Sequence, residues 1–389
     1  MIHSIARVFE ICAILGCLSS SVYYILCLWS VRAFLKESKF VAAIHSTQSL
    51  PPVSILKPLK GTDPQIYASF RSHCLQDYPE FEIIFGVSDA LDPAVASVEQ
   101  LKREFPQRSI QLVVCPKILG PNVKVSNLEQ MVQVAKYQHL LVNDSDIQVE
   151  RDYLRRIIAP LSDNEVGLVT SLYRGVTAPT LGSQLESLGI SSDFCAGVVV
   201  ARWLESGLHF GLGSTLAFRR KELESLGGFK AIVDFLADDY ELGQRIASLG
   251  LHVLLSDVVV ETHLPAYDFS GFLSHQMRWA RGVRDARLGG YIGLVSTFGF
   301  LWGLLGVLFA SGARWAWIVF GIVLVLRILV ALAVGRLVLK DRQLIAHLWL
   351  LPVRDLVAVG IWIISFWGST VKWRGDRFKL KNGRLIRIL

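Results

Sequence analysis

The first half of the chain alternates short apolar runs with longer stretches in which apolar residues recur at helical spacing. We interpret the apolar runs as strands, and they lie at residues 53–57, 81–87, 110–114 and 140–142. The stretches between them predict helices at residues 66–75, 94–105 and 125–135. Pro58 is expected to end the first strand. Because strands that alternate with helices form parallel sheets, this half predicts an α/β fold with a mostly parallel sheet and helices on both faces.

The same pattern continues as far as residue 263. Further strand-like runs lie at residues 167–172, 213–218 and 251–260. A helix is expected from Ala237 to Leu249, and Gly250 is expected to end it.

Long apolar runs lie on both sides of this sheet domain. Residues 11–31 are long enough to span a bilayer and predict an uncleaved N-terminal anchor, which a short linker over 46–52 follows. Residues 293–310 and 315–335 predict a transmembrane hairpin.

The last apolar run, residues 344–371, is interrupted by Pro352, Arg354 and Asp355. Charges are costly at the centre of a bilayer. A single span and a re-entrant pair of half-helices both remain open for this run.

The composition agrees with a membrane protein that has a substantial soluble part. Of the 389 residues, 52% are hydrophobic and 19% are charged, and the mean hydropathy is +0.43. The net charge of +7 is concentrated in residues 278–287 and 372–387, beside apolar runs. This placement favours contact with anionic lipid headgroups and argues against nucleic acid binding.

Charges around the anchor predict its orientation. Arg32, Lys36 and Lys39 follow it, whereas only Arg7 precedes it. Cytoplasmic flanks are enriched in Lys and Arg, so the sheet domain is expected in the cytoplasm. The six cysteines show no Cys-x-x-Cys spacing, which is typical of a reducing compartment.

Acidic residues follow two of the predicted strands. Asp144 and Asp146 come directly after the strand at 140–142, and Asp89 follows the strand at 81–87. Ligands of open α/β sheets bind beyond the carboxyl ends of strands, so these residues are expected at one edge. An Asp-x-Asp pair at such an edge can hold a divalent cation that neutralises a diphosphate, although short Asp-rich turns also occur for structural reasons.

A basic segment lies between the sheet domain and the C-terminal apolar runs. Arg278, Arg281, Arg284 and Arg287 recur at steps of three and are expected to share a broad face of a helix. Contact of Arg284 and Arg287 with lipid is the simpler alternative to a functional role.

Four motifs in order resemble the D, DxD, D and QxxRW pattern of processive and lipid-acting family 2 glycosyltransferases. They are Asp89, Asp144-Ser145-Asp146, Asp239 within Ala237-Asp238-Asp239-Tyr240, and Arg278-Trp279. His275 stands where the last motif has Gln.

Further stretches resemble the ceramide glucosyltransferases of family 21, and among these the bacterial hopanoid-biosynthesis glycosyltransferases are expected to be closest. They are the N-terminal anchor, Lys57-Pro58-Leu59-Lys60-Gly61 and Lys124-Val125-Ser126-Asn127-Leu128. A His that ceramide enzymes carry is absent here, where Ser192-Asp193-Phe194 stands, so the resemblance departs from ceramide at this point.

The resemblance implies a GT-A fold and an inverting transfer of glucose or N-acetylglucosamine from a UDP-sugar to a membrane lipid, such as a hopanoid polyol or ceramide. Its bacterial branch implies a bacterial inner membrane protein. Asp89 would meet the uridine, and Asp146 would bind Mg²⁺ or Mn²⁺ on the diphosphate with the help of Asp144. Asp239 would be the general base. The remaining candidates are Arg278, Trp279 and Gln276 for catalysis, and Lys57, Lys124 and Asn127 for donor binding.

Two other functions share part of this pattern. A processive polysaccharide synthase carries the same motifs but needs more spanning helices than the roughly four candidates here. A non-catalytic sugar-nucleotide binding module needs Asp144 and Asp146 but has no use for a base at Asp239. Whatever the function, Asp238 or Asp239 is expected to be the N-cap of the helix that follows.

The chain thus divides into five segments. They are the anchor and linker (1–50), the sheet domain (51–265), the QxxRW-like basic helix (266–292), the C-terminal membrane helices (293–371) and a basic cytoplasmic tail (372–389).

Overall fold

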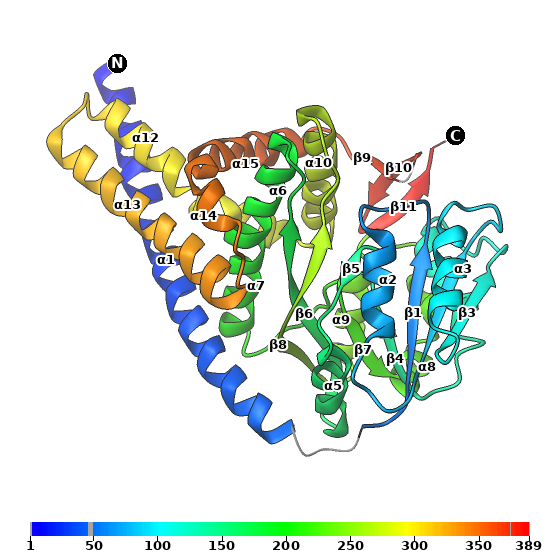
Figure 1. Ribbon diagram of the computed structural model, residues 1–389. Coiled ribbons are helices and arrows are strands. Elements are labelled where there is room, and N and C mark those ends of the chain that lie inside the picture. The colour runs from blue at the N-terminus through cyan, green and yellow to red at the C-terminus, as the bar shows by residue number, and fades with distance from the viewer. Residues whose placement is uncertain (1, 46–49, 374, 389) are drawn as a thin grey trace. The chain divides into compact units, whose positions relative to one another are not determined.

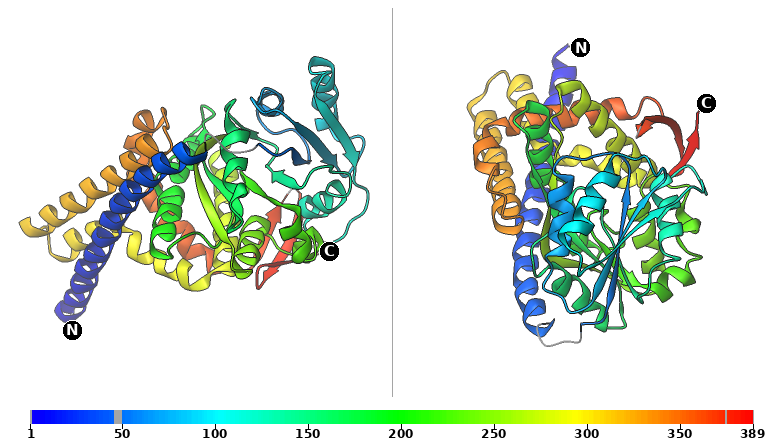
Figure 2. Two further views of the ribbon diagram at one scale, coloured as in Figure 1. Left: turned by 90° about the horizontal axis from the view of Figure 1, so that it is seen from below. Right: turned by 45° about the vertical axis from the view of Figure 1, so that its right-hand side comes forward.

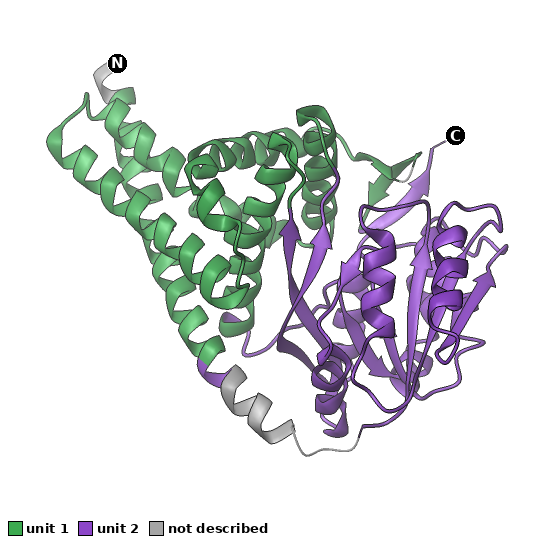
Figure 3. Cartoon of the chain, in the orientation of Figure 1, with its two compact units in different colours: residues 1–35, 177–203, 266–382 green, residues 36–176, 204–265, 383–389 purple. Residues whose placement is uncertain are grey.

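The computed structural model describes residues 2–45, 50–373 and 375–388. Most of the predicted linker, the Lys39 side chain and Arg374 lie outside the residues described. The chain forms two compact units, each assembled from three stretches (Figure 3). Unit 1 comprises residues 1–35, 177–203 and 266–382, and unit 2 comprises residues 36–176, 204–265 and 383–389.

Unit 2 is built on an eight-stranded sheet with the order β3-β2-β1-β4-β7-β6-β8-β5 (Figure 1). The strands are β1 (Val53–Leu59), β2 (Phe81–Val87), β3 (Ser109–Val114), β4 (His139–Val142), β5 (Ile147–Gln148), β6 (Val166–Val176), β7 (Leu216–Arg219) and β8 (His252–His263). Strands β3, β2, β1 and β4 are mutually parallel, whereas β7 is antiparallel to both of its neighbours. The sheet is therefore mixed but mostly parallel, as the sequence predicts.

Helices cover both faces of this sheet. On one face, α2 (Ile66–Cys74), α3 (Ala94–Glu104) and α5 (Tyr153–Ile158) share a buried apolar core with alternate residues of β1 and β2, among them Ile55 and Phe85. On the other face lies α4 (Val123–Met131), because a Cβ atom placed on Gly86 would strike the side chain of Met131. The predicted two-sided cover is confirmed.

Pro58 does not end the first strand. Strand β1 continues to Leu59, and Pro58 pairs in register with Gly86 of β2. The pairing of β1 with β4 ends at Leu56, so Pro58 lies beyond the stretch that has partners on both sides. A missing backbone donor is tolerated there.

The remaining elements of unit 2 are short. They are η1 (Ala159–Ser162), α8 (Arg220–Ser225), η3 (Phe229–Ile232), α9 (Asp238–Ser248) and β11 (Arg384–Arg387). Gly250 follows α9 with φ 81°, a conformation that favours glycine and ends the helix as predicted.

Unit 1 consists mainly of helices (Figures 1 and 2). They are α1 (Ile2–His45, of which residues 2–35 belong to this unit), α6 (Leu181–Gly189), η2 (Ile190–Phe194), α7 (Cys195–Leu204), α10 (Phe269–Ala286), α11 (Leu288–Gly293), η4 (Leu294–Thr297), α12 (Gly299–Phe309), α13 (Arg314–Leu332), η5 (Ala333–Val338), α14 (Leu344–His347), η6 (Leu348–Leu350) and α15 (Leu351–Ser365). Strands β9 (Thr370–Trp373) and β10 (Asp376–Lys381) pair antiparallel in the basic tail. The sequence predicts none of α6, α7 and the two strands of the tail.

Among the residues that the structure describes, three helical stretches are long and apolar enough to cross a membrane: Ile5–Glu37, Arg314–Val338 and Leu344–Ser365. The predicted anchor is thus longer than residues 11–31. Leu288–Thr297 and Gly299–Phe309 form a pair bent by 50°, which adds a fourth span if it is counted as one. The break in helical direction therefore falls in the first run of the expected hairpin.

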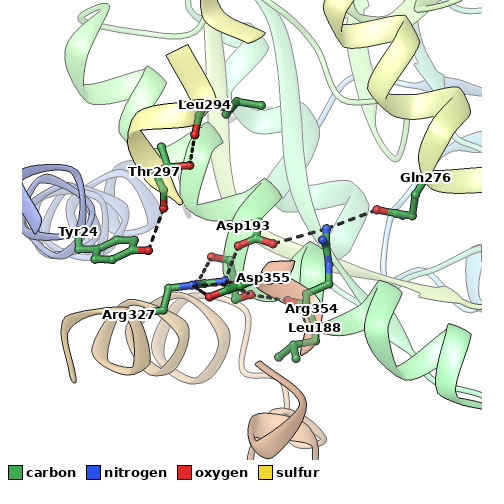
Figure 4. A network of polar contacts seen from close by, with 10 residues as sticks. Tyr24, Leu188, Asp193, Gln276, Leu294, Thr297, Arg327, Arg354 and Asp355 are labelled. Carbon is green, nitrogen blue, oxygen red and sulfur yellow. Dashed lines mark hydrogen bonds and ion pairs between the residues drawn. The ribbon is translucent and has the colours of Figure 1, made fainter. Parts of the chain in front are cut away.

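Charged residues inside these apolar helices meet one another (Figure 4). Arg327 of α13 is 3% exposed, and its Nη2 lies 2.7 Å from Asp355 Oδ1 on α15 and 2.5 Å from Asp193 Oδ1 in η2. Arg354 of α15 lies 3.5 Å from Asp193 Oδ2. The charges that interrupt the last apolar run are thus paired within unit 1, which offsets much of the cost of removing them from water.

Candidate active site

A buried asparagine fixes the end of β4, where the Asp-Ser-Asp motif begins. Asn143 Nδ2 donates to the hydroxyl of Tyr153 at 2.7 Å and to the backbone oxygen of Ser214 at 2.6 Å. Its Oδ1 lies 3.3 Å from Nε2 of the buried His73. Because the sheet is parallel from β2 to β4, Asp89 follows β2 at the same edge where Asp144 and Asp146 follow β4. The predicted common edge is confirmed.

Two lysines hold the first aspartate of the motif. Lys57 is fully buried, and its Nζ donates to the backbone oxygen of Asp144 at 2.9 Å. Lys124 of α4 places its Nζ 2.8 Å from Asp144 Oδ1 and 3.0 Å from Asp238 Oδ2. Lys124 therefore joins the end of β4 to the start of α9.

The second aspartate lies in a more acidic setting. The hydroxyl of Thr262 donates to Asp146 Oδ2, and Ser145 Oγ donates to Asp63 Oδ2 at 2.5 Å. Burial, followed by the charge of Asp144, raises the pKa of Asp146 to about 6. Burial also lowers the pKa of Lys57 to about 7, although the neighbouring carboxylates oppose that shift.

The donor set at this edge fits a hard divalent cation. Asp146 is a partly buried carboxylate with Asp144 as an acidic neighbour. Among the described residues no group of three or more His, Cys, Asp or Glu side chains is arranged to hold a metal. Two carboxylates are nevertheless enough for a cation that completes its coordination with phosphate oxygens, as Mg²⁺ commonly does.

Asp239 lies in the first turn of α9 and accepts two backbone hydrogen bonds. Gly213 N donates to Oδ2 at 2.7 Å, and Tyr240 N donates to Oδ1 at 2.8 Å. Burial, followed by the charge of Asp238, raises the pKa of Asp239 to about 6, and Lys124 opposes the rise. A carboxylate of this kind is largely ionised near pH 7 and yet basic enough to accept a proton.

Gly213 leaves room for the close approach of two carboxylates. A Cβ atom on Gly213 would lie 3.1 Å from Asp144 Oδ2 and 3.2 Å from Asp239 Oδ2. Asp144 and Asp239 therefore face the same small space within unit 2.

The prediction that Asp238 or Asp239 is the N-cap of α9 is wrong. The N-cap of α9 is Ala237, which offers no side-chain cap, and Asp238 and Asp239 belong to the first turn. Asp238 is instead 7% exposed and paired with Lys124, so it balances charge inside the unit.

The other donor-side candidates lie near the ends of β2 and in α4. Asp89 is exposed, and its Oδ1 accepts from Leu91 N at 2.9 Å. Asp89 therefore stabilises the turn after β2, which is a structural role. Asn127 is buried in α4, and its Oδ1 accepts from the hydroxyl of Ser88 at 3.0 Å.

In unit 1, helix α10 carries the QxxRW-like residues. His275 Nε2 lies 2.7 Å from Arg278 Nη2, and Trp279 packs against Phe194 with ring centroids 6.1 Å apart. Gln276 is buried, and its Oε1 accepts from Arg354 Nη2 at 3.4 Å, so it belongs to the buried charged network (Figure 4).

The basic face of α10 is largely engaged with backbone. Arg281 donates to the carbonyl oxygens of Trp367 and Thr370, and Arg284 donates to those of Ser365 and Gly368. These carbonyls lie at and beyond the end of α15, where arginine offsets the negative end of the helix. Capping thus accounts for Arg281 and Arg284 without a lipid.

Sequence reasoning missed Asp63, Thr262 and Glu186. Asp63 could have been found by the rule that identified Asp89, because it follows the end of β1 at the same edge. Thr262 and Glu186 carry no such signal, because their partners Asp146 and His275 are 116 and 89 residues away in the chain.

Comparisons with known proteins agree on one family. The model of glycosyl transferase family 21 matches residues 12–386. Ceramide glucosyltransferase 1 of Caenorhabditis elegans is 23% identical over 392 residues, which cover 97% of this chain and 82% of the relative. Ceramide glucosyltransferase of Komagataella phaffii is 35% identical over 126 residues, which cover 30% of this chain and 25% of the relative.

A solved structure shares the fold. A mannosyltransferase from Pyrobaculum calidifontis in complex with GDP-Man and Mn²⁺ is 20% identical, with a TM-score of 0.54, over 94% of this chain and 99% of that one. At this identity the likeness concerns the fold, and it confirms the predicted GT-A class.

Proposed function

Because the chain belongs to glycosyl transferase family 21 and is a glycosyltransferase, we propose that it transfers a hexose, with inversion, from a UDP-sugar to a hydroxyl of a membrane lipid. The sugar is glucose or N-acetylglucosamine, and the acceptor is a hopanoid polyol or ceramide. The proposal keeps the five-segment division of the chain, with residues 51–265 as the catalytic domain.

The observation that carries the proposal is the carboxylate of Asp239. Its pKa of about 6, its two backbone donors and its closeness to Asp144 across Gly213 suit a general base beside a donor site. In this role Asp239 accepts the proton of the lipid hydroxyl as that oxygen attacks the anomeric carbon and UDP departs. A pure binding module has no need of such a group.

The donor side is assigned to the edge formed by β2 and β4. Asp146, supported by Asp144, would hold Mg²⁺ or Mn²⁺, and the cation would neutralise the leaving diphosphate. Asp89 would contact the uridine, and Lys57, Lys124 and Asn127 would order this edge. The mannosyltransferase that shares the fold was solved with a nucleotide sugar and Mn²⁺, which supports this assignment.

The acceptor side is assigned to unit 1. Three helices in the described part of the chain are apolar and long enough to cross a bilayer, and the relatives are named for a lipid acceptor. Arg278 and Trp279, with Gln276 beside them, would act on the diphosphate or the acceptor.

The most direct experiment is lipid mass spectrometry. Membranes from bacterial cells with and without the chain are supplied with labelled UDP-glucose or UDP-N-acetylglucosamine, and lipid extracts are compared. We expect one labelled glycolipid that depends on Asp239. Labelled polymer in place of lipid indicates the processive synthase, and binding of UDP with no product from any lipid contradicts the proposal.

Orientation has its own test. The sheet domain is proposed to be cytoplasmic, as the charges after the anchor predict. Asp77 has a side chain that is 82% exposed, so Asp77→Cys is treated with a membrane-impermeant thiol reagent and the parent chain serves as control. Labelling only after the cells are permeabilised is expected, and labelling in intact cells reverses the topology.

A further inference from the structure

A chain of three polar side chains connects α6 to the candidate catalytic arginine of α10. Glu186 of α6 is almost fully buried, with 1% of its side chain exposed, and lies 3.1 Å from His275 Nδ1. The other ring nitrogen, Nε2, lies 2.7 Å from Arg278 Nη2. All three residues belong to unit 1.

The chemistry of arginine fixes the protonation of this imidazole. A guanidinium offers donors only and has no acceptor, so the contact with Arg278 requires an unprotonated Nε2. The ring proton therefore resides on Nδ1 and is donated to the carboxylate of Glu186. In this arrangement one ring nitrogen donates and the other accepts.

Aromatic rings limit the motion of the imidazole. Tyr267 stacks on His275 with a centroid distance of 5.5 Å and an angle of 25° between the planes. Trp279 contacts the same ring at 5.1 Å. A ring flip would exchange the donor and acceptor positions, and these contacts oppose it.

We infer that His275 and Glu186 are positioning residues: they hold the guanidinium of Arg278 beside Trp279. The inference rests on the proposed function, in which Arg278 acts in glycosyl transfer. It also explains the departure from the QxxRW pattern. A glutamine amide likewise offers one donating and one accepting group on a rigid plane, so histidine can replace it when Glu186 selects the tautomer.

The first test measures the tautomer and requires no substrate. The full chain is labelled with ¹⁵N-histidine in lipid bilayers, and the His275 signals are assigned by their loss in His275→Gln. We expect a protonated Nδ1 and an unprotonated Nε2 near pH 7. A protonated Nε2, in either the other tautomer or the imidazolium, overturns the inference.

The second test asks whether His275 acts through Arg278. His275→Ala is expected to lower kcat for lipid glycosylation at least about tenfold in the parent chain and to have little further effect in an Arg278→Ala background. His275→Gln is expected to recover kcat to within about threefold of the parent, because the amide replaces both contacts. His252→Ala, at a side chain that is 71% exposed on β8, is the matched control.

The outcomes separate the inference from the proposed function. An equal loss from His275→Ala in both backgrounds means that His275 acts independently of Arg278 and overturns the inference. If the parent chain glycosylates no lipid, the proposed function fails, while the ¹⁵N measurement still decides whether Glu186, His275 and Arg278 are linked as described.

Discussion

Lys124 Nζ lies 2.8 Å from Asp144 Oδ1, and this ion pair ties the start of α4 to the end of β4. The same ammonium contacts Asp238, so one cation serves two of the three carboxylates that surround it. Burial lowers the pKa of Lys124, but Asp144, Asp238 and Asp239 together raise it above its ordinary value. Lys124 thus remains charged and lowers the pKa of Asp239.

Replacing Lys124 by methionine removes that charge and keeps much of the side-chain volume. The pKa of Asp239 is expected to rise further, since Lys124 now lowers it, so the acid limb of the activity profile should move to higher pH. The measurement is kcat/KM for transfer as a function of pH. Lys102→Met, which removes an ion pair with Glu99 near the surface, should leave the acid limb of the profile at the same pH. If the acid limb of Lys124→Met is also unshifted, Lys124 does not lower the pKa of Asp239 as expected.

Asp239→Asn keeps the size of the side chain and removes its ability to accept a proton. We expect transfer to fall at least about 100-fold while UDP-sugar affinity stays within a few-fold. In the parent, activity should be fully present above the pKa of about 6 and decline as the pH falls through it, because protonation removes the base. Kinetics combined with donor titration separates the two effects.

Asp238→Asn provides the comparison for that substitution. It removes an ion pair with Lys124 from a buried position, so a stability loss of about 1–3 kcal/mol is expected, with a smaller effect on transfer. If Asp238 proves indispensable for transfer and Asp239 does not, the base lies one residue earlier.

Removal of the cation should weaken UDP binding in the parent but not in Asp146→Ala. The reason is that the Asp146 carboxylate is proposed to hold the cation on the diphosphate. Calorimetric titration of UDP with Mn²⁺, with Mg²⁺ and with a chelator measures this difference. Asp152→Asn, which changes an exposed acid at the N-cap of α5, is the control. If UDP binding depends on the cation equally in the parent and in Asp146→Ala, Asp146 does not hold it.

Arg327→Leu should destabilise unit 1 strongly. It leaves Asp355 and Asp193 without their shared cation, and breaking a buried ion pair on one side typically costs about 3–5 kcal/mol. The double variant with Asp355→Leu should recover part of the loss. Thermal unfolding in detergent reports both, with Arg314→Leu, an exposed position at the start of α13, as control. A double variant less stable than the single one contradicts this account.

The strands that sequence reasoning identified are those with a strong local signal. For Phe81–Val87 the predicted bounds and the observed bounds are the same, because an apolar run between polar turns indicates a strand without any distant partner. Strand β7 begins at Leu216, later than the sequence predicts. Its limits are set by its antiparallel pairing with β4 and β6, which its own composition does not reveal. Helices α6 and α7 are not predicted from the sequence because they are short, with 9 and 10 residues, and each contains glycine, which has a low helix propensity.

The candidate site divides in the same way. Asp144, Asp146 and Asp239 stand in short motifs and could be proposed from the sequence. Their electrostatic environment could not, because Lys124 reaches Asp238 across 114 residues and Thr262 reaches Asp146 across 116. Contacts at such separations exist only in the folded chain.

The pairing of Arg327 bears on how this chain is made. Its acidic partner Asp355 lies 28 residues later in the chain, whereas Asp193 lies 134 residues earlier. An arginine without an acidic partner disfavours the placement of a helix in lipid, and Arg327 has such partners on both sides of α13 in the chain. Entry of residues 314–338 into a bilayer is therefore expected to be most favourable once Asp193 or Asp355 can reach Arg327, so the assembly of this helix depends on η2 or α15 as well as on its own apolar residues.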